Sequence, residues 1–403
     1  MERPLDGVRV LDVGTRIAAP FCAGLLGELG ADVIKVEDPR GGDFMRTIGP
    51  FEDGYSLFWA VEGRGRRSVT CDLRTADGQA LFRRLAARAD VVCENFRPGT
   101  LEGWNIGPAD CDPGLVWVRI SVFGQDGPYA GRPGLDRQGI GYGGLLHLTG
   151  YPDTPPVRPG VTVSDYLTGA FGALHAVAQL YARRHAPDPG DGAAPVVVDA
   201  PLYGAILRIL EWTIAGHDRL GLVRERAGNR VPGSAPLDNF LTADGRYVCI
   251  VAGSDANFAR LCDAMGRPDL ATDPEWATLA QRAGRADEIT GIVAGWVRTL
   301  TATEVERRCI AHDVPVGTAY SAADIAADPH IAARGDLVTV DDPVLGPVRQ
   351  QAPFPRLAGT RPTPPTGAPV LGRHDDEVWL DLVGLTPAGL ADYRARGIVS
   401  PAG

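Results

Sequence analysis

The chain has 403 residues, of which 44% are hydrophobic and 22% are charged, and its formal charge is −10 at pH 7. This length exceeds one ordinary domain, and the composition is typical of a folded globular protein rather than a disordered or fibrous one. The negative charge argues against broad contact with nucleic acid or an anionic membrane surface, because both partners require a basic face.

The seven cysteines are scattered along the chain, odd in number and without a CxxC pair. We therefore expect reduced thiols in the cytoplasm, with neither a disulfide framework nor a zinc site. The N-terminus lacks the basic segment and apolar run of an export signal, and no uninterrupted apolar run is long enough to span a membrane. These features predict a cytoplasmic protein that is neither exported nor inserted in a membrane.

Strand and helix patterns alternate at the start of the chain. Strands are predicted at residues 8–13, 33–36, 68–73, 91–93 and 116–122, and helices at 18–29 and 78–87. The strand at 8–13, the helix at 18–29 and the strand at 33–36 form a βαβ unit. Several parallel strands flanked by helices predict an open α/β sheet.

A long helix is predicted from about residue 166, because apolar residues recur with the spacing of one buried face. These residues are Leu167, Phe171, Leu174, Ala178 and Tyr181. The Pro- and Gly-rich residues 185–195 predict a surface turn. A strand at 196–199 and a helix at 202–217 then close the first α/β block.

The pattern changes after residue 228. A hairpin is predicted at 239–251, with its turn at Asp244-Gly245, and short helices follow, so we expect a smaller α+β domain over 228–330. Extended segments return at 337–340 and 348–352. Thr386-Pro387 then predicts the start of a last helix, since proline is favoured at the first helical position.

Motifs for metal, hydrolase or dinucleotide chemistry are weak. Residues 139–144 satisfy G-x-G-x-x-G, but the preceding strand ends near residue 122, so we interpret them as a close-packing glycine turn. The seven histidines show no metal-ligand spacing, and H-E-x-x-H and G-x-S-x-G do not occur. We interpret His374, Asp375 and Asp376, before a predicted helix, as solvated capping residues.

Two groups of charged residues are candidates for chemistry. The first is the set of basic side chains Arg40, Arg46, Arg64, Arg66, Arg67 and Arg97. They either collect a phosphorylated ligand at the carboxyl edge of the sheet or lie in solvated loops. The second is Asp165, immediately before a helix rich in glycine and alanine, which either caps that helix or acts as a shielded nucleophile.

Ordered sequence blocks give a more specific indication. They are LDGVRVLD (5–12), LGADVIKVE (29–37), RRSVTCDL (66–73), ENFRPG (94–99), Asp165 with Thr168-Gly169, and LGRHDDEV (371–378). In this order and spacing the chain resembles the class III CoA-transferase (CaiB/BaiF) family over nearly its whole length.

This resemblance implies a Rossmann-like large domain built from residues 1–217 and a return segment, 331–403, with the small domain of 228–330 between them and two chains interlocked as a homodimer. It implies an enzyme without a metal that moves CoA from an acyl-CoA to a carboxylic acid. Asp165 would be the covalent nucleophile, passing through an aspartyl anhydride and an aspartyl-CoA thioester. The expected coenzyme A contacts are Arg16, Ile17, Ala18, Arg40, Arg66, Arg67, Asn95, Phe96 and Arg97.

Departures from the family pattern affect the binding residues more than the nucleophile. Ile17, Asp38 and Gly103 stand where relatives often carry glutamine, a basic residue and arginine. An α-methylacyl-CoA racemase on the same fold is one alternative, but Leu135 occupies the position of the histidine base that racemases use. A CoA-binding or NAD-dependent protein without covalent catalysis is the other alternative.

Overall fold

The computed structural model describes residues 3–185 and 195–401, so the turn predicted at 185–195 lies almost entirely outside the described residues. The chain forms two compact units. The large unit contains Met1–Leu145, Pro159–Ile214 and His330–Gly403, and the small unit contains Leu146–Arg158 and Ala215–Pro329. No helix among the described residues is both long and apolar enough to cross a membrane.

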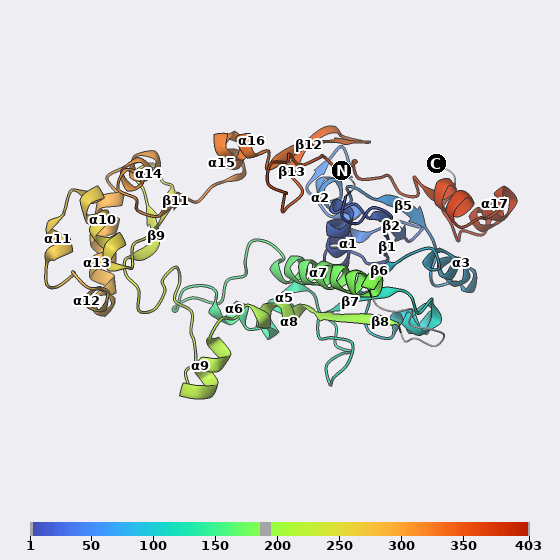
Figure 1. Ribbon diagram of the computed structural model, residues 1–403, viewed down its shortest axis with the longest axis horizontal. Helices are drawn as coiled ribbons and strands as arrows, with labels where there is room; N and C mark the ends of the chain where they lie inside the picture. The colour runs from blue at the N-terminus through green and yellow to red at the C-terminus, as the bar shows by residue number, and fades with distance from the viewer. Residues whose placement is uncertain (1–2, 186–194, 402–403) are drawn as a thin grey trace. The chain divides into compact units, whose positions relative to one another are not determined.

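A six-stranded parallel sheet is the centre of the large unit (Figure 1). Its strands are β1 (Arg9–Asp12), β2 (Asp32–Glu37), β5 (Arg67–Thr70), β6 (Val91–Glu94), β7 (Val116–Ser121) and β8 (Val196–Pro201). Their spatial order is β5-β2-β1-β6-β7-β8 and every pairing is parallel. This is the order of a doubly wound nucleotide-binding sheet, in which the winding reverses between β1 and β6. The predicted open parallel α/β sheet is confirmed.

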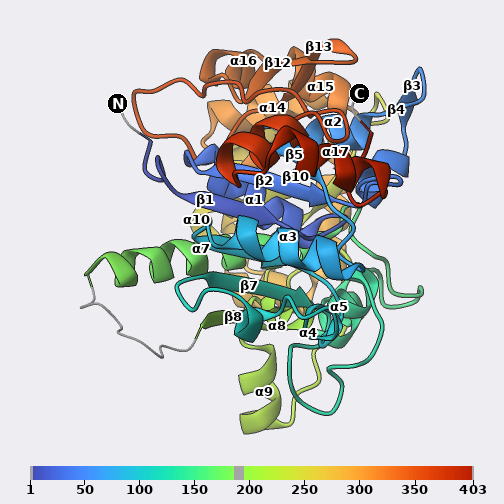
Figure 2. The same ribbon diagram turned by 90° about the vertical axis from the view of Figure 1, so that its right-hand side faces the viewer.

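Helices cover both faces of this sheet because alternate strand residues point to opposite sides. Val10 of β1 packs in a layer with α1 (Ala18–Glu28) and α7 (Val163–His185), whereas Leu11 packs with α3 (Ala76–Ala86) and α17 (Pro387–Ala395). Figure 2 shows α3 and α17 together on the side of the sheet that faces the viewer. Local signals fix the helix ends: Thr75 and Thr386 cap α3 and α17 through their hydroxyl groups.

Shorter elements complete the large unit. They are the helices α2 (Leu57–Glu62), α4 (Thr100–Gly103), α5 (Asp136–Tyr142) and α8 (Leu202–Arg208), the strand pairs β3 (Phe51–Glu52) with β4 (Tyr55–Ser56) and β12 (Leu337–Asp342) with β13 (Gly346–Gln351), the 3-10 turns η1 (Phe44–Thr47) and η2 (Pro108–Asp110), and the π-helical turn η3 (Glu377–Leu382). The prediction of a single helix at 202–217 is wrong. It breaks after α8, where Glu211 adopts a positive φ of 53°, and α9 (Thr213–Leu220) follows.

The predicted buried face of α7 is also wrong. Leu174 and Tyr181 are 63% and 68% exposed, while the buried positions are Ser164, Thr168, Gly169, Gly172, Ala173 and Ala176. The sheet and α1 approach α7 so closely that only small side chains fit between them. The larger apolar residues therefore lie on the open side of the helix.

The segment that follows β13 returns to the edge of the sheet. Asp375 is buried and accepts hydrogen bonds from the backbone N–H (2.7 Å) and the hydroxyl (2.8 Å) of Thr70 in β5. His374 accepts from the backbone N–H of Ser68 at 3.1 Å. The interpretation of Asp375 as a solvated cap is therefore wrong, because the carboxylate serves a strand rather than the water-exposed end of a helix.

The small unit packs helices on a three-stranded antiparallel sheet. Its strands are β9 (Leu237–Leu241), β10 (Tyr247–Val251) and β11 (Val316–Thr318), and its helices are α10 (Asp255–Met265), α11 (Asp269–Thr272), α12 (Leu279–Gly284), α13 (Ala286–Val297), α14 (Ala302–Ala311) and α15 (Ala322–Ala327). The predicted hairpin is confirmed as β9 and β10. The short helices α6 (Leu145–Leu148) and α16 (Pro329–Arg334) lie at boundaries of the two units.

Candidate active site

Asp165 lies in the first turn of α7, not immediately before the helix as the sequence pattern predicts. The start of α7 is capped by Asp136 of α5, whose Oδ1 accepts from the backbone N–H (2.9 Å) and the hydroxyl (2.8 Å) of Ser164. Because Asp136 satisfies the end of the helix, the carboxylate of Asp165 is not needed as a cap. Among residues 3–185 and 195–401, no hydrogen bond or ion pair engages the Asp165 side chain, so it is open to react.

Glycines in α7 bring this carboxylate close to the start of α1. A Cβ atom on Gly169 would lie 2.7 Å from the carbonyl oxygen of Ala18, and one on Gly172 would lie 2.9 Å from the side chain of Val118. Only glycine allows the two helices and the sheet to approach this closely. Since Asp165 is about one turn before Gly169, the same contact places it near the loop of Arg16.

The electrostatic surroundings raise the pKa of Asp165 to about 7. Burial is the main cause because it disfavours the charged form, and the negative charge of Asp136 adds to it, while the guanidinium of Arg16 opposes it. Near neutral pH a large fraction of the side chain is therefore an ionised carboxylate with few solvating partners. A desolvated carboxylate of raised basicity is suited to nucleophilic attack.

The loop between β1 and α1 is fixed by polar contacts on both sides. Arg16 has a positive φ of 66°, and its backbone N–H donates to Asp43 Oδ1 at 3.0 Å. Asn95 brackets the preceding residue, since its side chain accepts from Thr15 N–H at 2.8 Å and donates to Thr15 C=O at 2.7 Å. Arg16 extends over the ring of Phe44, 4.0 Å from its centroid. The loop is thus held in a conformation that few non-glycine residues adopt.

A buried ion-pair network lies beneath this loop. The ammonium group of Lys35 in β2 lies 3.2 Å from Asp12 and 2.8 Å from Asp43. Burial opposes its charge, but these two carboxylates raise the pKa of Lys35 above its usual value. Arg66 joins the network at 2.8 Å from Asp12. The network links β1 and β2 to the residues that directly precede β5 and η1, and so supports the loop above it.

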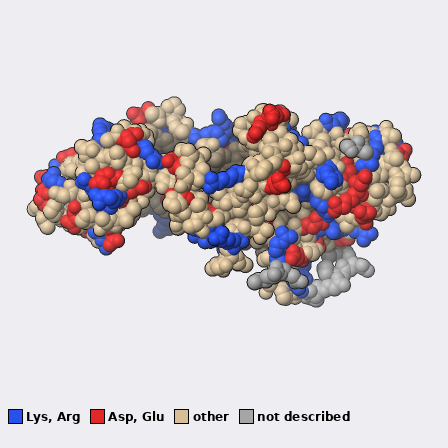
Figure 3. All heavy atoms as spheres, turned by 90° about the horizontal axis from the view of Figure 1, so that it is seen from above, with Lys and Arg blue, Asp and Glu red and all other residues tan. Residues whose placement is uncertain are grey.

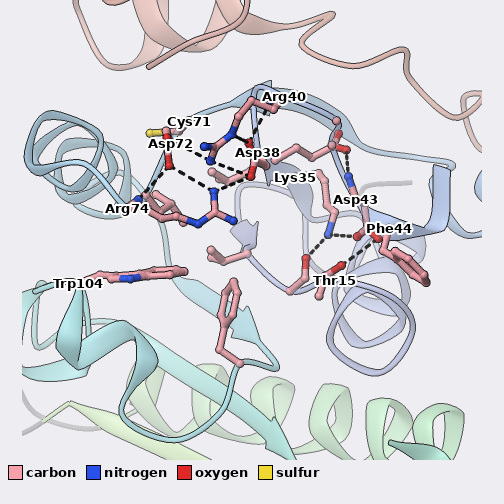
Figure 4. Close-up of a pocket in the computed structure, with 18 of the residues that line it drawn as sticks. Thr15, Lys35, Asp38, Arg40, Asp43, Phe44, Cys71, Asp72, Arg74 and Trp104 are labelled. Carbon is pink, nitrogen blue, oxygen red and sulfur yellow. Dashed lines mark hydrogen bonds and ion pairs between the residues drawn. The ribbon is translucent and has the colours of Figure 1, made fainter. Parts of the chain in front are cut away.

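A cavity of about 480 Å³ opens at the carboxyl ends of β1, β2 and β5 (Figure 4). Its lining includes Thr15, Phe44, Phe96 and Trp104, and the rings of Phe96 and Trp104 meet edge to face at 5.4 Å. It lies where the strand order reverses between β1 and β6, which is the usual ligand position in an open α/β sheet. The mixture of aromatic surfaces and charged groups is suited to a nucleotide.

Four charged side chains alternate at this cavity, and we refer to Asp38, Arg40, Asp72 and Arg74 as the charge ring (Figure 4). Arg40 donates to both oxygens of Asp38, at 2.9 and 3.1 Å, and lies 3.2 Å from Asp72. Arg74 lies 2.6 Å from Asp38 and 3.6 Å from Asp72. Burial of Asp38 opposes ionisation, but hydrogen bonds from Arg40 and Arg74 lower its pKa to about 2.

The structure brings some of the predicted contact residues together and separates others. Arg40 and Phe96 line the cavity, and Arg16, Ile17, Ala18 and Asn95 form or hold the adjoining loop and helix start. Arg66 is buried against Asp12, and Arg67 pairs with Asp32 and Glu377, so both are engaged by carboxylates away from the cavity lining. Arg97 is exposed. As coenzyme A contacts, all nine residues stay predictions.

Arg74, Phe44 and Trp104 line the cavity without having been singled out from the sequence. A signal existed for Arg74, because it follows the carboxyl end of a predicted strand, where ligands of open α/β sheets bind. Trp104 is at the end of the four-residue helix α4, which has no periodic pattern. Acidic and basic side chains are interspersed on the face of the molecule seen in Figure 3.

The glycine-rich segment 139–144 is part of helix α5 and its end rather than the predicted turn. Close packing is its role nonetheless, since a Cβ atom on Gly139 would lie 2.7 Å from Ser164 Oγ and one on Gly143 would lie 2.6 Å from Ile206 Cβ. It does not join a strand to a helix, as a dinucleotide site requires. Within the described parts of the chain, no group of three or more His, Cys, Asp or Glu residues is arranged to hold a metal ion.

Comparisons with known proteins place these features in a family. The family model for CoA-transferase family III matches residues 5–375. Succinyl-CoA–D-citramalate CoA-transferase and the beta subunit of succinyl-CoA–L-malate CoA-transferase, both of Chloroflexus aurantiacus, are 42% and 40% identical to this chain, and each alignment covers 98% of both chains. Succinyl-CoA:mesaconate CoA-transferase of Haloarcula hispanica is 35% identical over 94% of this chain and 96% of its own. A CAIB/BAIF family protein from Brucella suis has a solved structure with a TM-score of 0.83 and 31% identity, covering 95% of this chain and 100% of that one.

Proposed function

The chain belongs to CoA-transferase family III and transfers CoA from an acyl-CoA thioester to a carboxylic acid, and we propose that Asp165 carries this reaction as its covalent nucleophile. The observation that supports this role most directly is the state of its carboxylate. It is largely shielded from water, it has a pKa of about 7, and Asp136 already provides the helix cap that Asp165 would otherwise supply.

The proposed reaction has four balanced steps. An oxygen of Asp165 attacks the thioester carbonyl, the C–S bond breaks, and CoA thiolate leaves a mixed anhydride. The thiolate attacks the aspartyl carbonyl and expels the donor acid, which leaves an aspartyl-CoA thioester. The acceptor carboxylate attacks the carbonyl of that thioester, which forms a second mixed anhydride as the C–S bond breaks and the thiolate leaves again. Attack of the thiolate on the acceptor acyl group then forms the new acyl-CoA and restores Asp165.

Water must be excluded during these steps because both intermediates hydrolyse. Gly169 and Gly172 contribute by bringing α7 so close to α1 and the sheet that no room remains beneath Asp165. The loop of Arg16, which Asn95 and Asp43 hold in place by hydrogen bonds, forms the wall next to Asp165. We propose that coenzyme A places its nucleotide end in the cavity between Phe44 and Trp104, with its pantetheine arm reaching Asp165.

The relatives indicate the class of acids. Those compared above are named for succinyl-CoA as donor and for citramalate, malate or mesaconate as acceptor. We therefore propose succinyl-CoA and short dicarboxylic acids as the substrates of this chain. The racemase alternative requires a base at position 135, and Leu135 supplies none.

We further propose that the protein acts as a cytoplasmic homodimer. The exposed apolar residues Leu174 and Tyr181 of α7 support a second copy as the partner, because a large apolar stripe on a helix is normally covered. The described cysteines are free thiols, which is typical of a reducing compartment. Sedimentation of wild type and of Leu174→Glu tests the dimer: the variant should sediment as a monomer.

Mass spectrometry tests the nucleophile. Incubation with succinyl-CoA and hydroxylamine should convert Asp165 to a hydroxamate in its peptide, and Asp165→Ala should lose both the adduct and turnover. Asp392→Ala, a carboxylate removed from the exposed helix α17, is the matched control and should keep both. Undiminished turnover in Asp165→Ala would eliminate the proposed role. Exchange of the substrate α-proton with deuterium in the absence of an acceptor acid would support the racemase instead.

A further inference from the structure

We propose that the charge ring is a phosphate clamp occupied by its own carboxylates: Arg40 and Arg74 bind a phosphate group of coenzyme A, and Asp38 and Asp72 hold them until that phosphate arrives. This inference rests on the proposed binding of coenzyme A in the cavity. It assigns a phosphate-binding role to Arg74 and an affinity-setting role to the two aspartates.

The geometry of the ring already has the form of an arginine–anion complex. Arg40 presents two nitrogen atoms to the two oxygens of Asp38, at 2.9 and 3.1 Å. Phosphate oxygens accept from the same guanidinium fork. Arg40 and Arg74 are 61% and 55% exposed, so a ligand can reach both from solvent. The aspartates therefore occupy the positions that an incoming phosphate would take.

Exchange of partners is feasible because the arginine end of each ion pair reaches solvent, while the side chains of Asp38 and Asp72 are only 29% and 12% exposed. Screening by water and the entropy of two long side chains leave such pairs with little net stabilisation. A phosphate offers more acceptor oxygens and more charge than one carboxylate. It can thus displace Asp38 or Asp72 from an arginine without a large loss to the folded protein.

The other carboxylates of the cavity cannot exchange in this way. Glu37 is buried and bonded to Arg46 at 2.8 Å, and Asp43 is buried beside Lys35. The cavity lining carries three positive side chains, Lys35, Arg40 and Arg74, against four negative ones, Glu37, Asp38, Asp43 and Asp72, a difference of one negative charge.

The net charge of the lining therefore does not attract a phosphate group. Attraction begins when the charge ring opens and the two arginines leave the aspartates for the phosphate. Because the aspartates compete for these arginines, coenzyme A binds less tightly than it would to Arg40 and Arg74 alone.

Calorimetric titration with free coenzyme A tests the clamp without turnover. Asp38→Asn and Asp72→Asn remove the competing charge, and the asparagine keeps an oxygen for the backbone N–H of Arg40 or Arg74. Each should bind coenzyme A about two- to fivefold more tightly, which corresponds to the loss of one exposed ion pair. Arg74→Gln should bind it roughly tenfold more weakly. Arg396→Gln, which removes an exposed arginine that also bridges two aspartates, Asp77 and Asp392, outside the cavity, should leave the affinity unchanged.

A second titration with 3′-dephospho-CoA identifies the phosphate. If the effect of Arg74→Gln disappears with this ligand, the clamp holds the 3′-phosphate, and if the effect persists, it holds the diphosphate; both outcomes support the clamp. Unchanged affinity in either Asp38→Asn or Arg74→Gln, or weaker binding in Asp38→Asn, would overturn it. A wild-type protein that binds no coenzyme A would refute the proposed cavity occupant as well, so the two failures are distinguishable.

Discussion

Substitution of Gly169 by alanine tests how the candidate site is positioned. The added Cβ atom would lie 2.7 Å from the carbonyl oxygen of Ala18, 3.0 Å from a ring carbon of Phe21 and 3.3 Å from the backbone nitrogen of Cys22. Two of these three atoms belong to the backbone of α1 and cannot rotate away. The helices must therefore separate locally if the methyl group is to fit.

Two opposing effects set the size of the change. Alanine is favoured over glycine inside a helix by about 1 kcal/mol. Overpacking of a close contact costs about 1–3 kcal/mol, and a clash with backbone lies at the upper end of that range. We expect a net loss of about 1–2 kcal/mol in the free energy of unfolding. Because Asp165 is one turn away, its displacement from the Arg16 loop should lower kcat by roughly 10- to 100-fold.

Thermal unfolding and steady-state kinetics with succinyl-CoA measure both effects. The matched control is Gly291→Ala in α13, where no atom lies within 4 Å of the added methyl group. That variant should be as stable as wild type or more stable by up to about 1 kcal/mol, with unchanged kcat. A Gly169→Ala protein with wild-type stability and kcat would refute the argument that glycine is required for this helix contact.

Three further results are expected. At pH values below about 7 the value of kcat/KM should decrease, because Asp165 has a pKa of about 7 and must be ionised to attack. Asp136→Asn removes a charge that raises this pKa, so it should move the acidic limb of the profile down by roughly one pH unit. An unmoved limb in the variant would contradict this. Lys35→Met should cost about 3–5 kcal/mol in urea unfolding because it leaves Asp12 and a second buried carboxylate short of a cation, and a near-neutral result would show that water reaches them. In Arg282→Met three buried carbonyl groups lose their hydrogen-bond donor, and each loss should cost about 1–3 kcal/mol of stability. Limited proteolysis should therefore cleave the small unit faster than in wild type. An unchanged cleavage rate would mean that the carbonyl groups find other partners.

Much of the sheet could be predicted from the sequence because its strands are short apolar runs. The predicted strands at 8–13 and 33–36 correspond to β1 and β2, and Thr386-Pro387 starts α17 as expected. Helix α7 shows where this reasoning fails. Large apolar residues suggest a buried face, yet a very close neighbour selects Gly169 and Gly172 instead and leaves Leu174 exposed.

The candidate site was less predictable than the fold, since pairing between distant residues decides which charges face a ligand. Arg66 and Arg40 are both basic residues near strand ends, but Asp12 of another strand holds Arg66 in the core while Arg40 reaches the cavity. Nothing local to either arginine distinguishes these outcomes. Asp165 was found through its position among family sequence blocks, and its raised pKa depends on Asp136 from a separate helix.

The hydrogen bond from Thr70 to Asp375 joins residues 305 positions apart. Strand β5 is at the margin of the sheet, so its outer polar groups have no protein partner until that distant segment has been synthesised. On the ribosome, the first half of the large unit must therefore wait with an unprotected strand while the intervening residues emerge. A stalled or truncated nascent chain therefore exposes a strand edge that can pair with other chains. The need for chaperones during synthesis then depends on the order of the segments along the chain, and not on the stability of the folded protein.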